Sequence, residues 1–212
     1  MNKYIEVALL TKSKKNNGYC VAGIDVNSGG FVRLVSGDPE SHGALTDQDI
    51  QYKDKSFYNF LDVARIPIIS KEPIEYQPEN VLIERGQPWE KIGRLSLNDL
   101  LKLHPPENHF DILGNVYPYI TNERISTVGY SLVLIKVENL IISHPHPGST
   151  KADFEYRSTT YSNLSVTDPD YYHTPNQTVI NHAILVVSLP DAPYMDRYFY
   201  KFVAKIIPIL TV

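Results

Sequence analysis

The chain has 212 residues, a net charge of −4, 42% hydrophobic residues and 21% charged residues. This composition is that of a globular protein and excludes wholesale disorder, and the length suffices for one large β domain or two small barrels. The negative net charge excludes a protein that is strongly basic overall, which is the usual basis of non-specific duplex binding. A polyanion can therefore bind only at a local basic patch. A single cysteine, Cys20, excludes an internal disulfide and a zinc site built on several cysteines.

The N-terminal sequence shows no signal-peptide pattern. The longest apolar runs, such as residues 184–189, fall far short of the roughly 20 residues that span a bilayer. We therefore expect a cytoplasmic protein without a membrane partner. Fifteen tyrosines, many β-branched residues and only two methionines favour sheet over a helix bundle.

Three short strands are predicted at the start of the chain, over residues 4–10, 19–26 and 31–35. The polar segment Lys12–Gly18, which ends in Asn-Gly, predicts the first turn, and Asn27–Gly30 predicts the second. Strands joined by such short turns form a meander.

An irregular excursion, two further strands and a helix complete the first half, over residues 37–59, 60–69, 81–83 and 96–103. Gln77–Asn80 predicts the turn between the two strands. Ser96 is placed to cap the helix, with Asp99 at the third helical position, and His104-Pro105-Pro106 ends it.

The second half repeats this pattern of short strands, over residues 128–142, 151–157, 161–166 and 182–189, with 198–209 as a strand pair or a short helix. No alternation of strands and helices supports a parallel doubly wound sheet. The predicted fold is therefore mainly β, with two OB-like small β-barrels in tandem and one or two short helices. We expect the first barrel over residues 1–106, a junction over 107–125 and the second barrel over 126–212.

Three segments near the N-terminus resemble the opening of the prokaryotic dual OB-domain family. They read Thr11-Lys12-Ser13-Lys14-Lys15, Gly18-Tyr19-Cys20-Val21-Ala22-Gly23 and Gly30-Phe31-Val32-Arg33-Leu34-Val35-Ser36. Short matches continue in order to about residue 207, among them Leu61-Asp62-Val63, Gln77-Pro78-Glu79-Asn80 and Val166-Thr167-Asp168-Pro169. The family usually has Arg, Trp and Pro where this chain has Tyr19, Phe31 and Leu34.

The resemblance implies a pair of OB folds, found in bacterial proteins that are associated with defence or mobile elements and are suspected of binding nucleic acid or nucleotides. It implies no known reaction. Because the family's Arg is replaced by Tyr19, the resemblance gives less support to an anion bound beside Cys20.

An OB barrel binds oligonucleotides through a basic groove and exposed aromatic rings on which bases stack. The candidate ligand-binding residues supply charge, rings or amides of this kind. They are Lys12, Ser13, Lys14, Tyr19, Arg33, Gln77, Asn80, Tyr171 and Tyr172.

Structural roles compete with this interpretation. The lysines are also typical of a solvated turn, and Gln77 and Asn80 of a capped turn. Arg33 is as well suited to a carboxylate partner such as Asp62 as to a bound anion. Of the tyrosines in the second half, Tyr156 and Tyr161 fit half-buried strand positions. Tyr171 and Tyr172 follow a turn and are expected to be more exposed.

No complete metal or catalytic site is recognisable. Asp168 and Asp170 need several further oxygens to hold a hard cation, and His144 and His146 lack a third ligand. Phosphate-binding glycine loops, zinc-protease motifs and the serine elbow are absent from the sequence. Cys20 lies in an apolar strand, where a small hydrophobic residue is expected rather than a nucleophile.

The leading hypothesis is a non-catalytic module that binds single-stranded nucleic acid or nucleotides, without a cofactor or a metal. One alternative is a protein–protein adaptor subunit of a larger assembly, which the acidic balance favours. Another is a cation-dependent enzyme that acts on a phosphorylated substrate.

Overall fold

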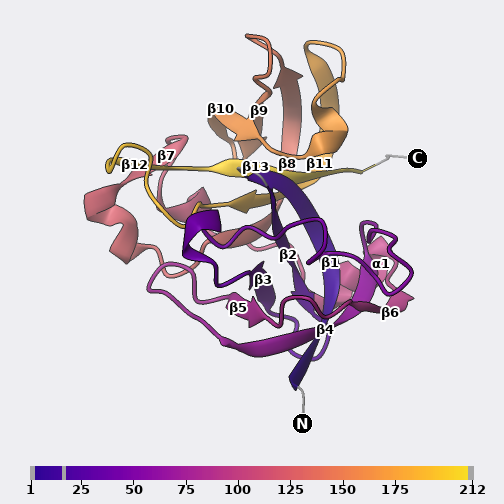
Figure 1. Cartoon of the computed structure of the whole chain (residues 1–212). Coiled ribbons are helices and arrows are strands. Elements are labelled where there is room, and N and C mark those ends of the chain that lie inside the picture. Colours follow the sequence, from indigo (N-terminus) through magenta and orange to yellow (C-terminus); the bar gives the residue numbers. More distant parts are fainter. Residues whose placement is uncertain (1–2, 16–17, 210–212) are drawn as a thin grey trace. The chain divides into compact units, whose positions relative to one another are not determined.

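The structure is a computed structural model that describes residues 3–15 and 18–209. The chain divides into two compact units, Met1–Pro105 and Pro106–Val212, and each is built mainly of strands (Figure 1). The predicted mainly-β class is confirmed, while the predicted domain boundaries stay predictions. Among the described residues, no helix has the length and apolar character needed to cross a membrane.

The first unit is a five-stranded barrel with an added edge strand. Its elements are β1 (Lys3–Lys15), β2 (Gly18–Asp25), β3 (Phe31–Val35), η1 (Pro39–Ser41), β4 (Asp62–Lys71), β5 (Asn80–Ile83), β6 (Glu90–Arg94) and α1 (Leu97–Leu103). Neighbouring strands follow the order β1-β2-β3-β5-β4-β6, and a further β1–β4 pairing closes the first five into a ring. The β3–β5 pair is parallel and the other strand pairs of this sheet are antiparallel.

The second unit contains a closed barrel and a small separate sheet. Its elements are η2 (Ile112–Gly114), β7 (Tyr119–Thr121), η3 (Asn122–Thr127), β8 (Leu132–Ser143), β9 (Lys151–Tyr156), β10 (Thr159–Val166), η4 (Pro169–Tyr171), β11 (Thr178–Ser188), β12 (Tyr198–Tyr200) and β13 (Phe202–Pro208). The barrel order is β10-β13-β11-β8-β9, and β7 pairs with β12 outside it. If the five barrel strands of each unit are numbered in chain order, both barrels have the same order of neighbours. In both, the third and fifth strands form the one parallel pair, which is β3–β5 in the first unit and β10–β13 in the second.

Several local predictions need correction. Strand β1 extends to Lys15 because its last residues pair with β2, so Lys12 and Lys14 lie in a strand and not in a turn. The Asn16 and Asn17 positions of the predicted turn lie outside the described residues. The strand expected to start at Val128 begins at Leu132, after η3.

The capped helix is confirmed: the Ser96 hydroxyl accepts the Asp99 backbone N–H at 3.1 Å and begins α1. Strand β6 was missed because all five of its residues are exposed, so it has no apolar alternation. The segment 198–209 forms two strands, β12 and β13, which pair with β7 and with barrel strands rather than with each other.

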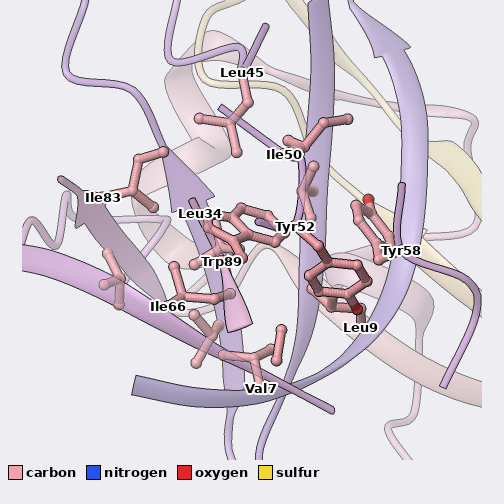
Figure 2. Packing of buried hydrophobic residues seen from close by; sticks show 14 residues of the cluster. Val7, Leu9, Leu34, Leu45, Ile50, Tyr52, Tyr58, Ile66, Ile83 and Trp89 are labelled. Atoms are coloured by element: carbon pink, nitrogen blue, oxygen red, sulfur yellow. The ribbon is translucent and has the colours of Figure 1, made fainter. Parts of the chain in front are cut away.

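Aromatic rings and branched aliphatic side chains fill the first barrel (Figure 2). Trp89 is buried, and its ring stacks on that of Tyr58 with centroids 5.7 Å apart. The Tyr58 hydroxyl donates to the backbone oxygen of Thr11 at 2.8 Å, which satisfies its one polar group inside the core. Loop residues therefore help to close the interior of the barrel.

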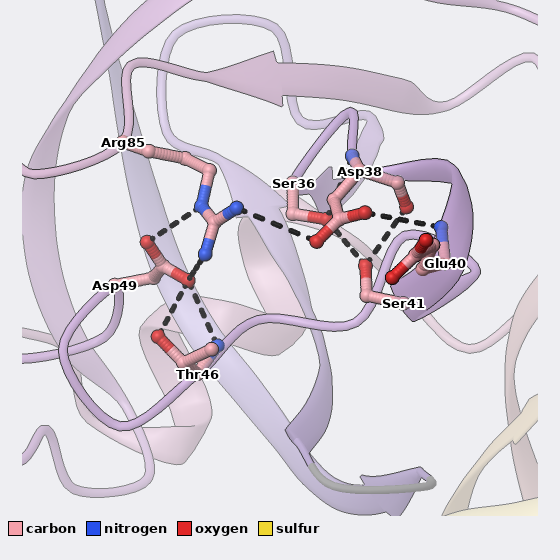
Figure 3. A network of polar contacts seen from close by, with 7 residues as sticks. All are labelled: Ser36, Asp38, Glu40, Ser41, Thr46, Asp49 and Arg85. Carbon is pink, nitrogen blue, oxygen red and sulfur yellow. Dashed lines mark hydrogen bonds and ion pairs between the residues drawn. The ribbon is translucent and has the colours of Figure 1, made fainter.

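A charged network fixes the irregular excursion after β3 (Figure 3). Arg85, which follows β5, binds Asp49 through Nε at 3.1 Å and approaches Asp38 at 3.6 Å. Asp49 also accepts the backbone N–H and the hydroxyl of Thr46, at 2.9 and 2.7 Å. Burial raises the pKa of the Asp49 carboxyl, but the hydrogen bonds from Arg85 and Thr46 outweigh it and hold the pKa below its usual value.

Replacing Asp49 by Asn should lower the free energy of unfolding of the first unit by about 1–2 kcal/mol at pH 7. Because the folded-state pKa of Asp49 is depressed, its contribution is present at neutral pH and is lost as pH falls below about 4. Urea unfolding at pH 7 and pH 3 should show the difference between wild type and Asp49→Asn shrinking at pH 3. The control is Glu40→Gln, an exposed carboxylate of the same excursion; an equal loss in both variants would contradict the assignment.

Lys201 is fully buried in the second unit, between β12 and β13. Its ammonium donates to the backbone oxygens of Ile112 and Asn115, both at 2.6 Å, and to the side-chain oxygen of Asn115 at 2.9 Å. Burial lowers the pKa of Lys201 to about 7, and Asp111 acts in the opposite direction. One ammonium therefore ties the η2 segment to the start of the last barrel strand.

Replacing Lys201 by Met should lower the free energy of unfolding by about 2–4 kcal/mol, because one buried and two part-buried acceptors lose their donor. The unfolded chain keeps the lysine proton up to about pH 10, whereas the folded protein releases it near pH 7. Wild-type stability should therefore rise between pH 7 and pH 9, by up to about 1.4 kcal/mol per pH unit, and Lys201→Met should lack this rise. Chemical denaturation at both pH values tests this, with the exposed Lys136→Met as control. A rise of the same size in both variants would contradict it.

Candidate nucleic-acid interface

The free end of the β1–β2 hairpin carries three lysines, Lys12, Lys14 and Lys15. Lys14 pairs with Tyr19 across the two strands, and Lys12 pairs with Val21. Cross-strand partners share a face of the sheet, so both lysines lie on the face that carries the buried Val21. Lys12 is half-buried and Lys14 is exposed, so the side chains lead from the core to the surface.

Aromatic rings surround the Lys12 ammonium. It lies 3.9 Å from the ring centre of Phe57, 4.7 Å from that of Tyr19 and 6.0 Å from that of Tyr58. These distances are those of cation–π contacts. Phe57 is exposed, and sequence reasoning missed it because it lies in an irregular polar segment without periodicity. A bulky ring in such a segment was the one signal available.

Burial lowers the pKa of the Lys12 ammonium, and Asp47 acts in the opposite direction. Burial and the same Asp47 raise the pKa of Tyr19. Asp47 therefore reduces the positive potential at this point, while Lys14 has no carboxylate partner among the described contacts. A cation beside aromatic rings can receive a phosphate and a base of one nucleotide.

Ser13 and Arg33, two other predicted ligand residues, are buried. The Arg33 guanidinium lies 3.7 Å from Glu79, and its backbone N–H donates to the Glu79 oxygen at 2.9 Å. The suggested partner Asp62 is wrong, because β3 neighbours β2 and β5 and not β4, where Asp62 lies. Asp62 instead pairs with Lys91 at 2.7 Å. Arg33 thus has an internal carboxylate partner.

Gln77 and Asn80 are buried at the start of β5. The Asn80 amide donates to the Gln77 side-chain oxygen at 3.1 Å, and Asn80 pairs in register with Arg33. The structure therefore brings Arg33, Gln77 and Asn80 together as buried residues, with Arg33 and Asn80 on the face of the sheet opposite the core residues Leu34 and Val81. It places them apart from the surface that Lys14 and Phe57 form.

Tyr171 and Tyr172 lie in the second unit and are half-buried, contrary to the expected exposure. The Tyr172 hydroxyl donates to the Thr167 backbone oxygen at 3.1 Å. Burial, with Asp168 and Asp170 nearby, raises the pKa of Tyr171 to about 12. The 3-10 turn η4 folds both rings back against the barrel, which a turn pattern alone does not reveal.

Asp168 and Asp170 share the Lys205 ammonium. Asp168 is buried and also accepts the Ile206 backbone N–H at 2.9 Å. Burial raises the pKa of the Asp168 carboxyl despite Lys205. Within residues 3–15 and 18–209, no group of three or more His, Cys, Asp or Glu side chains is placed to hold a metal ion.

Tyrosines gather on the small β7–β12 sheet, a cluster that sequence reasoning also missed. Tyr119 lies 4.6 Å from Tyr198 and 6.1 Å from Tyr117 between ring centres, and Tyr194 lies 6.0 Å from Tyr200. We call Tyr117, Tyr119, Tyr194, Tyr198 and Tyr200 the tyrosine cluster. Tyr117 and Tyr194 are 60% and 58% exposed. Their separation by about 80 residues in the sequence hid the cluster.

Comparisons with known proteins give a family and distant structural likenesses. No curated protein matches the chain. A murine DNA-binding protein solved with double-stranded DNA is 5% identical with a TM-score of 0.42, over 99% of this chain and 98% of that chain. The p204 HINb domain is 8% identical with a TM-score of 0.41, over 95% and 97%. Both TM-scores lie below 0.5, so neither likeness bears on function. The model of the dual OB-containing domain matches residues 5–206, nearly the whole length, and the chain therefore belongs to this family.

Proposed function

We propose that this protein is a non-catalytic module that binds single-stranded nucleic acid or nucleotides. The observation that carries the proposal is the Lys12 ammonium between the rings of Tyr19 and Phe57, beside the exposed Lys14. In OB barrels the loop between the first two strands is one of the elements that bind oligonucleotides, and these residues flank that loop. The resemblance to the prokaryotic dual OB family supports a bacterial defence or mobile-element setting.

A single strand suits these side chains better than a duplex. The exposed Phe57 ring offers a face on which one base can stack, which requires an unpaired base. Lys14 then lies within the same surface to contact a phosphate, and Lys12 lies beneath the rings. Arg33, Gln77 and Asn80 are buried and have a structural role in this arrangement, so they do not touch the strand.

Replacing Lys12 and Lys14 together by Ala should weaken binding of a labelled single strand about 10-fold or more at low salt. Fluorescence anisotropy with single-stranded DNA, single-stranded RNA and duplex at two salt concentrations measures this. For wild type, log affinity should fall with log salt with a slope of about −0.7 per neutralised phosphate. Phe57→Leu should also weaken binding, because a stacked base contributes about 1–3 kcal/mol.

The matched control is Lys71→Ala. Lys71 is exposed, and the β1–β4 register, which pairs Lys3 with Ile68, places it at the other end of the barrel from Lys12. Asp47→Asn should act in the opposite direction and tighten binding, because it removes the carboxylate nearest Lys12 and Tyr19. Absence of binding to all three nucleic acids, or equal binding by the Lys12/Lys14 and Lys71 variants, would refute the proposal.

A protein–protein adaptor is the second candidate, and the tyrosine cluster favours it. Tyrosines are enriched at protein interfaces because a large rigid ring contacts the partner at a low cost in entropy. Met195, 74% exposed, lies next to Tyr194 in the chain. The nearby charges have both signs, with Arg197 beside Asp196, so this surface lacks the basic character of a phosphate-binding face.

Replacing Tyr117 and Tyr194 by Ser should abolish capture of a protein partner from extracts of the source cells, because it removes the two most exposed rings of the cluster. Affinity capture with quantitative mass spectrometry compares wild type, this variant and Lys14→Ala. The adaptor function predicts a partner that wild type and Lys14→Ala retain and the tyrosine variant loses. A partner retained by all three would place the interface elsewhere.

A further inference from the structure

A cavity of about 790 Å³ opens at one end of the second barrel. The β8–β9 loop, residues 144–150, forms one wall, and the end of β10 and residues 172–174 form the others. Its volume falls in the range of small-molecule sites. The β8–β9 loop occupies the place in the second ring that the β1–β2 loop occupies in the first.

Hydrogen bonds hold the wall of this cavity in place. The His144 backbone N–H donates to the Asn176 side chain at 2.8 Å, and its ring nitrogens lie 3.3 Å from the Thr150 hydroxyl and 3.4 Å from the Thr174 hydroxyl. Tyr172 is fixed by its own hydrogen bond to Thr167. Two prolines, Pro145 and Pro147, stiffen the loop. The wall is therefore formed before any ligand arrives.

Donors for an anion converge on the cavity. The exposed imidazoles of His146 and His173 line it together with His144, and an imidazole offers an N–H in either protonation state. The Lys151 ammonium donates to the hydroxyl of Ser165, a lining residue, at 2.9 Å. The described residues that line the cavity include no aspartate or glutamate. Burial and the neighbouring Asp168 raise the pKa of the lining residue Tyr172, and Asp168 itself is paired with Lys205.

We propose that this cavity binds a small organic phosphate of nucleotide size. The phosphate lies against His146 and His173, within the field of Lys151. The Tyr172 ring and the two loop prolines provide the apolar surface for the rest of the ligand. A cavity of this volume has room for a mononucleotide. This site is on the second barrel and does not depend on the strand-binding surface proposed for the first.

Isothermal titration with adenosine monophosphate, adenosine and inorganic phosphate tests the site on the full chain. Wild type should bind the monophosphate, and His146→Ala/His173→Ala should weaken its affinity at least 10-fold. His144 is left intact because it helps to hold the loop. Lys151→Met should also weaken binding, since it removes the nearby positive charge without shortening the side chain greatly.

The control is Lys136→Ala, an exposed lysine of β8. It lies seven residues before Ser143, roughly 23 Å along the strand, and should bind as wild type does. The Lys12/Lys14 variant should also keep full affinity for the monophosphate, so failure of the strand-binding proposal leaves this result unchanged. The proposal is overturned if the monophosphate does not bind, if adenosine binds equally well, or if the histidine variant binds as tightly as wild type.

Discussion

Each barrel is closed by one parallel pair of strands, and buried polar side chains hold that pair in both units. In the first unit, Arg33 of β3 lies opposite Asn80 of β5 and contacts the preceding Glu79. In the second unit, the buried Asp168, which follows β10, accepts the Ile206 backbone N–H of β13 at 2.9 Å and pairs with Lys205 of the same strand. A parallel pair needs a long crossover and cannot be set by a tight turn. Specific polar contacts between the two segments of each parallel pair therefore help to fix the register on which closure of the ring depends.

This constraint explains why several predicted ligand residues are structural. Arg33, Gln77 and Asn80 have side chains that recognise bases and phosphates, but all three lie at the closing pair, where burial demands internal partners. The same side-chain groups serve a ligand-binding role and a structural role, so the residue types alone do not distinguish the two. The strand order decides between them, because it places β3 beside β5 and removes Asp62 from reach of Arg33.

Patterns local in sequence were predictable. Alternation and turn residues indicated the strands of both barrels, and Ser96 with Asp99 indicated the helix. The surfaces were not predictable in the same way, because they join distant segments. Phe57 contacts Lys12, 45 residues away, and His146 and His173, 27 residues apart, line one cavity. The extension of β1 to Lys15 was missed since pairing with β2 outweighs the polar composition of the segment. The predicted exposure of Tyr171 was wrong for a related reason, because η4 turns the ring inward.

The two barrels share a ring order but carry different chemistry at the loop between their first two strands. The first has an ammonium under aromatic rings, and the second has imidazoles and hydroxyls around a cavity. A flat exposed ring with neighbouring lysines is suited to a base from a chain that continues past it, whereas a cavity of about 790 Å³ is suited to a ligand of small-molecule size. With a net charge of −4, neither site receives help from a long-range attractive field. At both proposed sites, recognition must therefore come from short-range contacts. Such contacts depend on where the ring and the phosphate of the ligand lie, so each site should select its ligand by that geometry.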